Sequence, residues 1–133
     1  MTSNSAGVLE AIFEADFCPN SYGYRPKRSP HRALAEVRRS VLRYRSMRRM
    51  STVIEVDRSC YFDTIRHSIL LDKIARRVQD PQVFHLIKQI LKAGGKVGVP
   101  QDGPFSPLAA NSYLNEVDWT FDAIRRKTAQ GLS

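Results

Sequence analysis

Residues 51–70 read STVIEVDRSCYFDTIRHSIL, and the predicted architecture rests mainly on this stretch. Four of its first seven residues are β-branched, which is typical of a strand, and Asp57 ends that strand. Many phosphoryl-transfer sites hold magnesium on such an aspartate, because a hard cation prefers oxygen ligands in a fixed position. Strand-end aspartates are common, however, and this feature alone identifies no function.

Amphipathic helices are predicted on both sides of this strand. Two of them have a strong start signal, Ser29-Pro30 and Asp80-Pro81, in which an N-cap residue precedes a proline at the first helical position. A single strand cannot form a sheet, so this strand is expected to pair with a hairpin near residues 96–100 or with strands outside this sequence. The predicted helices cover residues 7–17, 67–78, 81–92 and 106–126, with one more running from Pro30 through Tyr44.

Positive charge is the unusual feature of the composition: 21 Lys and Arg against 13 Asp and Glu give a net charge of +8 and a pI near 9.9. Between Arg25 and Arg49 the sequence has ten basic residues and one acidic residue, Glu36. A charged helix face is often merely solvated, but so large an excess favours contact with phosphate groups. The residues expected to contact nucleic acid are Arg32, Arg39 and Arg43.

Several other classes of function lack support in the sequence. No Ser-His-acid or Cys-His arrangement is recognisable, and the three histidines are expected at the surface or at helix ends. Cys18 and Cys60 are far apart, so neither a disulfide framework nor a zinc site is expected. No apolar run approaches membrane-spanning length, and residues 1–8 lack the features of a signal peptide. We therefore expect a cytoplasmic protein without a membrane partner.

Three segments carry a resemblance to a known family. They are SYGYRPKRSPHRAL at 21–34, VDRSCYFDTIRHSIL at 56–70 and GVPQDGPFSPLAANSYLNEVD at 98–118. In this order and with near-family spacing, they resemble the fingers, palm and P-Q-G motifs of group II intron reverse transcriptases. The resemblance implies an α+β fold: the helix-rich fingers (about 7–50) and part of the palm (about 51–126) of a right-hand polymerase, with an incomplete palm sheet.

The resemblance also implies a reaction and its partners. In the family, the 3′-hydroxyl of a DNA primer attacks the α-phosphate of a deoxynucleoside triphosphate, and two Mg²⁺ ions clamp the attacking and leaving oxygens. Asp57 matches the first metal-binding, catalytic aspartate, and the backbone carbonyl of Arg58 matches a further metal ligand. The implied partners are a template or intron RNA, a DNA primer and a deoxynucleoside triphosphate, with Mg²⁺ as the cofactor.

Four further positions match family residues near the incoming nucleotide. Phe62 matches the side chain that lies under the sugar and discriminates deoxyribose from ribose by its bulk. Gln101 lies in the loop that borders the sugar and the templating pair. Arg25 and Arg28 match fingers positions near the triphosphate, where guanidinium groups suit phosphate oxygens.

The sequence also departs from the family pattern. The family's Tyr-x-Asp-Asp motif, which supplies the other catalytic aspartates, does not occur in it. Arg58, Ser59 and Cys60 replace Ile-Lys-Gly, and Cys60 is expected to need an ordinary backbone conformation where glycine has more freedom. Asp102 replaces the second glycine of P-Q-G-G and adds a negative charge near a loop that should approach nucleic acid. These departures indicate relaxed constraint on catalysis.

Three functions remain open at this point. The first is a truncated reverse transcriptase that binds template, primer and nucleotide but does not polymerise alone. The second is a small basic RNA-binding module without catalysis, and the third is one half of a split polymerase whose missing acids come from another chain. Salt-sensitive RNA binding that survives loss of Asp57 favours the second, whereas Mg²⁺-dependent primer extension that needs Asp57 favours the third. The oligomeric state stays open.

Overall fold

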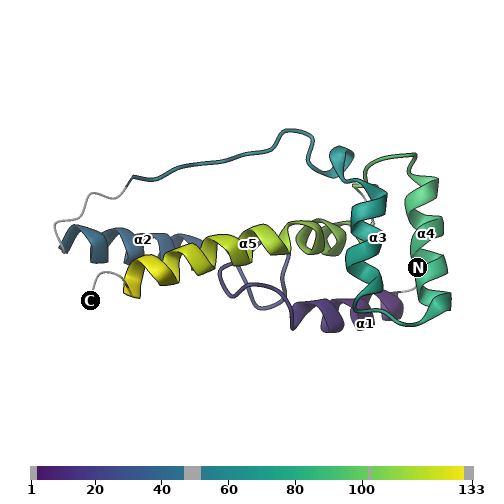
Figure 1. The fold of residues 1–133 in the computed structure, drawn as a ribbon, viewed down its shortest axis with the longest axis horizontal. Coiled ribbons are helices and arrows are strands. Elements are labelled where there is room, and N and C mark those ends of the chain that lie inside the picture. Colours follow the sequence, from purple (N-terminus) through teal and green to yellow (C-terminus); the bar gives the residue numbers. More distant parts are fainter. Residues whose placement is uncertain (1–2, 47–51, 102, 131–133) are drawn as a thin grey trace. The chain divides into compact units, whose positions relative to one another are not determined.

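The computed structural model describes residues 3–46, 52–101 and 103–130, and the regular elements in these residues are helices (Figure 1). The chain forms two compact units, which we call the core unit (Met1–Ser21 with Cys60–Ser133) and the basic unit (Tyr22–Ser59). In chain order the helices are α1 (Ser3–Glu14), α2 (Pro30–Ser46), the short 3-10 helix η1 (Phe62–Thr64), α3 (His67–Ala75), α4 (Pro81–Ala93) and α5 (Ser106–Gln130).

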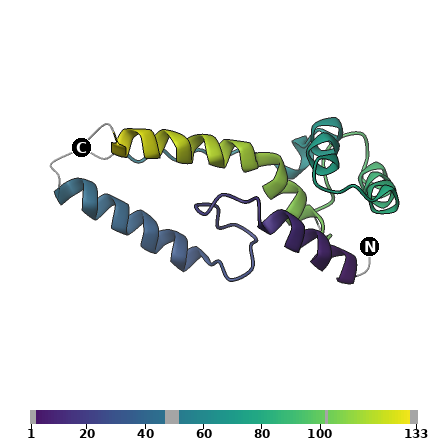
Figure 2. The same cartoon turned by 60° about the horizontal axis from the view of Figure 1, so that its bottom comes forward.

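Apolar residues from all four long helices of the core unit meet in one hydrophobic core. α3 packs against both α4 and α5, and α1 packs against α5, as Figure 2 shows from a second direction. Burying a large apolar side chain contributes about 1.5–3 kcal/mol, so this cluster is the main source of stability. Its largest fully buried apolar side chains are Leu9, Ile65, Leu70, Ile74, Ile87 and Leu91.

The helix α5 is longer than predicted and is buried along only part of its length. The predicted apolar face begins at Ala110, which is buried, but Phe121 and Ile124 farther along are 65% and 55% exposed. Helical spacing identifies an apolar face without saying how much of it has a packing partner. No helix in the described part of the chain is long and apolar enough to cross a membrane.

Both predicted helix starts are confirmed, and each has the expected side-chain hydrogen bond. Ahead of α4, the carboxylate of Asp80 accepts from the backbone N–H groups of Gln82 at 2.8 Å and Val83 at 3.3 Å. At the start of α2, the hydroxyl of Ser29 accepts from the N–H of Arg32 at 3.3 Å. Each cap satisfies donors that the first turn of a helix leaves without a partner.

The strand predicted at residues 51–57 is not formed in the part of it that the structure describes. Residues 52–57 run as an irregular stretch (Figure 1), and Ser51 lies outside the described residues. A strand needs a neighbouring strand for its backbone hydrogen bonds, and residues 3–46, 52–101 and 103–130 contain none. The helix-rich character is confirmed, while the palm sheet and the division into fingers and palm stay predictions.

Of the two forms expected for residues 93–103, a glycine-rich loop or a tight hairpin, the described residues form a loop, and no hairpin near 96–100 pairs with residues 52–57. The N–H groups of Gly98 and Val99 donate to the carbonyls of Ile65 and Phe62, at 2.8 and 2.9 Å, and not across a hairpin. The loop is thereby docked on the segment that contains η1. Short glycine-rich segments fit a hairpin or a docked loop equally well, because the choice depends on a partner far away in sequence.

Cys60 corrects another expectation, because its backbone is not in an ordinary conformation. Its φ angle is +53°, in the left-handed region that costs a residue with a side chain about 1 kcal/mol. The turn requires this conformation, since the carbonyl of Cys60 accepts from the N–H of Asp63 at 3.1 Å to begin η1. The glycine that the family has here thus fits the observed backbone better than cysteine does.

Replacing Cys60 with glycine is therefore expected to stabilise the protein by about 1 kcal/mol, since it relieves the strained φ angle. Urea unfolding measures the change. Ser59→Gly, at the neighbouring exposed position with no positive φ angle, is the control and should bring no gain. Equal stability of the parent and the Cys60→Gly protein would contradict this account of the turn.

Candidate functional site

Gln101 lies at a cavity of about 350 Å³ beside the docked loop. Asp63 of η1 lines the same cavity, and its neighbour Phe62 accepts the backbone hydrogen bond from Val99. Two residues predicted to contact the nucleotide, Phe62 and Gln101, therefore lie on segments that bond to each other. Gln101 is exposed, so its amide is accessible to a ligand in the cavity. The other lining residues are Gly94, Val97, Gly98, Val99 and Pro100.

Both segments around this cavity are anchored to α5. Tyr61, whose ring centroid is 5.8 Å from that of Phe62, donates its hydroxyl hydrogen to the carbonyl of Ala110 at 2.8 Å. On the other side, the buried hydroxyl of Ser106 donates to the carbonyl of Pro100. The positions of Phe62 and of the Gln101 loop thus depend on the packing of α5. Asp102, the departure predicted to disturb this loop, is not among the described residues.

Arg25 and Arg28 lie in the irregular loop of the basic unit, where the backbone turns sharply. Tyr24 and Lys27 have positive φ angles of 52° and 60°, and the N–H of Arg28 bonds to the carbonyl of Arg25 at 3.3 Å. The guanidinium of Arg28 lies 5.2 Å from the centre of the Tyr22 ring, whereas Arg25 is buried. One turn therefore holds the two arginines that were predicted to approach the triphosphate.

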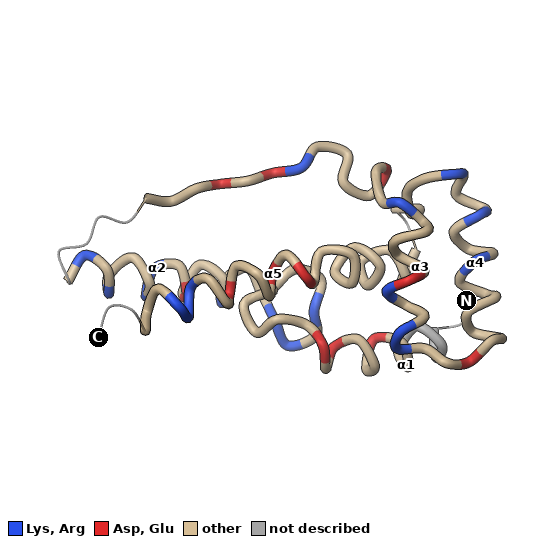
Figure 3. The backbone as a smooth tube through the Cα atoms, in the orientation of Figure 1, with Lys and Arg blue, Asp and Glu red and all other residues tan. Residues whose placement is uncertain are grey.

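The helix α2 presents the other predicted arginines, and none of its residues is buried. Lys and Arg are marked along it in Figure 3. Arg39 forms an ion pair with Glu36 at 2.7 Å, and its side chain remains 75% exposed. Arg32 donates to the carbonyl of Lys27 at 2.6 Å, and Arg43 is exposed. The three arginines predicted to contact nucleic acid therefore lie on one accessible helix.

Asp57 and Arg58 belong to the basic unit, whereas Phe62 and Gln101 belong to the core unit. Asp57 is exposed. Among the described residues, no three His, Cys, Asp or Glu side chains gather in a way that could hold a metal ion. Because a two-metal site needs several carboxylates, these residues do not complete one, and Mg²⁺ binding stays a prediction.

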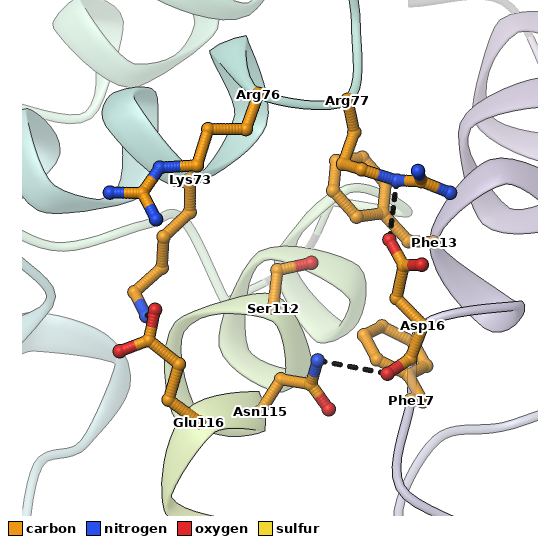
Figure 4. Close-up of a pocket in the computed structure, with 9 residues that line it drawn as sticks. All are labelled: Phe13, Asp16, Phe17, Lys73, Arg76, Arg77, Ser112, Asn115 and Glu116. Atoms are coloured by element: carbon orange, nitrogen blue, oxygen red, sulfur yellow. Dashed lines mark hydrogen bonds and ion pairs between the residues drawn. The ribbon is translucent and has the colours of Figure 1, made fainter. Parts of the chain in front are cut away.

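A second cavity, of about 150 Å³, lies between α1, α3 and α5, and sequence reasoning did not identify it (Figure 4). Its polar rim is internally paired: Arg77 with Asp16 at 2.5 Å, and Lys73 with Glu116 at 2.8 Å. The hydrogen bond and charge of Lys73 hold the pKa of Glu116 below its usual range. Because each of these charges has a partner, the arrangement favours a role in holding the segments of the core unit together rather than in catalysis.

Asp122 is a buried carboxylate whose role the helical pattern of α5 did not reveal. One of its oxygens accepts from the side-chain amide of Asn20 at 2.7 Å and from Arg125 at 2.9 Å, and the other lies 2.6 Å from Arg126. Burial alone raises the pKa of such a group, but here the two arginines outweigh burial and hold the pKa of Asp122 below its ordinary value of 3.8. Asp122 thus ties the segment after α1 to α5.

The lowered pKa of Asp122 predicts how stability changes in acid. A group whose folded-state pKa lies below its unfolded value stabilises the fold fully above the unfolded pKa, and this contribution is lost as pH falls through the folded pKa. Melting temperatures measured between pH 7 and pH 2.5 should therefore decline below about pH 4. The Asp122→Asn protein should be less stable at pH 7 and should lack this part of the decline. Parallel curves for the two proteins would contradict the assignment.

Comparison with known proteins adds an independent line of evidence, although no model of a protein family matches the chain. Protein YkfC of Escherichia coli K12 is 40% identical over 120 residues, which cover 84% of this chain and 31% of that protein. The group II intron-encoded protein LtrA of Lactococcus lactis subsp. cremoris is 37% identical over 120 residues, which cover 84% and 19%. Nuclear intron maturase 2 of Arabidopsis thaliana is 28% identical over 106 residues. The chain spans less than a third of the length of these relatives.

Proposed function

Because this chain is a relative of the group II intron-encoded proteins, we propose that it provides RNA- and nucleotide-contacting surfaces of an intron-encoded, RNA-directed DNA polymerase. The contribution of its own residues is binding and positioning. The basic unit would hold the phosphates of a template or intron RNA, and Gln101 and Phe62 would border the incoming nucleotide. A DNA primer would complete the substrate.

The observation that carries this proposal is the character of α2. Its sequence contains five arginines and one glutamate, and none of its residues is buried. So large an excess of one charge lowers the stability of the helix itself, because like charges on neighbouring turns repel. Phosphate groups relieve that repulsion, and the guanidinium fork matches their geometry. The exposed ion pair between Arg39 and Glu36 is worth little, so a phosphate can displace the glutamate.

Polymerisation by this chain alone is not part of the proposal. Asp57 is the one residue of the sequence that matches a catalytic carboxylate of the family, and the described residues gather no metal-holding group. Positioned charges at a phosphoryl-transfer site each contribute orders of magnitude in rate. The chain is therefore proposed to bind RNA without extending a primer. The alternative, that it is one half of a split polymerase, must be distinguished by experiment.

Substituting Asp57 with alanine separates these alternatives. RNA affinity is expected to stay within about twofold of the parent, because Asp57 is an exposed acid and its loss removes only weak repulsion from phosphates. Fluorescence anisotropy with a labelled intron RNA fragment measures the affinity, and Glu55→Ala, an exposed acid in the same segment, is the matched control. Mg²⁺-dependent primer extension by the parent that Asp57→Ala abolishes would refute a binding-only role.

A further inference from the structure

The side chain of His67 joins the segment 56–70 directly to the segment 98–118. Its ring nitrogen Nε2 lies 2.5 Å from the backbone carbonyl oxygen of Gly98, across 31 positions of sequence. A carbonyl oxygen can only accept, so Nε2 of His67 must carry the proton and donate it. The contact is partly buried, which makes a lost hydrogen bond there more costly than one at the surface.

Gly98 is held from three sides at this point. Its N–H donates to the carbonyl of Ile65 at 2.8 Å, and its carbonyl accepts from His67. Its third side faces η1, where an added Cβ would lie 2.9 Å from Cα of Asp63. These three contacts fix the peptide at Gly98. Two of them come from backbone atoms, and the third comes from the side chain of His67.

We propose that His67 is a positioning residue for Gln101: through the Gly98 carbonyl, it fixes the loop that presents Gln101 to the 350 Å³ cavity. Gln101 is three residues beyond Gly98, and two further anchors lie between them: the N–H of Val99 on the carbonyl of Phe62 and the Ser106 hydroxyl on the carbonyl of Pro100. Without the histidine, the loop keeps these anchors and the bond from the Gly98 N–H to Ile65, but it loses the hydrogen bond at the Gly98 carbonyl. An amide contact to a ligand depends steeply on position, so a loosened loop weakens binding without removing any group that touches the ligand.

This inference rests on the proposed nucleotide contact of Gln101, but the loop can be tested separately from it. In His67→Leu, hydrogen exchange of the Gly98 and Val99 amides, followed by NMR, is expected to be about tenfold faster, as loss of one hydrogen bond implies. His67→Gln keeps a donor at similar reach and should restore protection. His85→Leu removes an exposed histidine of α4 and should leave both amides unchanged.

The second readout is affinity for a fluorescent deoxynucleoside triphosphate in the presence of Mg²⁺. His67→Leu is expected to weaken binding about tenfold and His67→Gln to recover most of the loss. The double variant His67→Leu with Gln101→Ala should bind no more weakly than Gln101→Ala alone, because both changes remove the same contact between Gln101 and the nucleotide. Unchanged amide exchange in His67→Leu, or losses that multiply in the double variant, would overturn the proposal. If neither the parent nor any variant binds nucleotide, the proposed nucleotide contact is wrong. The amide exchange of Gly98 and Val99 still decides whether His67 positions the loop.

Discussion

Replacing Gly98 with alanine is expected to destabilise the core unit by about 3 kcal/mol. The φ angle of Gly98 is +88°, which a residue with a side chain adopts only under strain. An alanine Cβ would also lie 2.9 Å from Cα of Asp63 and 3.0 Å from the carbonyl oxygens of Asp63 and Phe62. These are backbone atoms, so relief requires the loop to leave η1 and to break its hydrogen bonds to Phe62 and Ile65.

Urea unfolding followed by circular dichroism measures this loss, and Gly7→Ala is the control. Gly7 lies within α1, and nothing is within 4 Å of its added Cβ. Alanine there should stabilise the helix by about 0.5–1 kcal/mol, because it restricts the unfolded chain. The same substitution thus has opposite signs at the two sites. A Gly98→Ala protein as stable as the parent would show that the loop is not docked as described.

Neutralising Arg32, Arg39 and Arg43 together is expected to weaken RNA binding about 100-fold at low salt, because three charge-assisted contacts to phosphate are lost. Glutamine has a helix propensity close to that of arginine, so α2 should remain helical. Anisotropy titration of a labelled RNA at 50 mM salt measures the change, and circular dichroism checks the fold.

A matched control removes three positive charges from the core unit instead. Arg76 directly follows α3, and Lys88 and Lys92 lie in α4; all three are exposed, and their change to glutamine lowers the net charge by the same amount. If net charge alone attracts RNA, the two triple variants lose the same affinity. If α2 holds the phosphates, the control loses at most a few-fold. Equal losses would therefore contradict a specific role for α2.

Local sequence signals were sufficient for the helices and insufficient for the sheet. Ser29-Pro30 and Asp80-Pro81 predicted helix starts because the hydrogen bonds of an N-cap reach only two or three residues along the chain. The strand, and the choice between a loop and a hairpin at 93–103, depended on partners that a local pattern cannot specify. At 96–100 the partner was the backbone around η1, and for residues 52–57 the described chain holds no neighbouring strand.

The candidate site was predictable only as far as the resemblance supplied it. Phe62 and Gln101 come from separate motifs, and the structure joins their segments through the hydrogen bond of Val99. The arrangement around Asp122 was not predictable, because its partner Asn20 is 102 positions away and no periodicity encodes such a contact. Cys60 was misjudged because its conformation is set by the turn into η1 rather than by its own preference.

The most direct test of the central claim, that α2 binds RNA through its phosphates, is the salt dependence of RNA affinity. For single-stranded RNA, the logarithm of the binding constant should fall with the logarithm of salt concentration by about 0.7 for each phosphate neutralised. The slope for the parent protein should therefore be steeper than that for the Arg32, Arg39 and Arg43 variant by about 2. Two equal slopes would mean that these arginines contact no phosphate, and the account of α2 would be wrong.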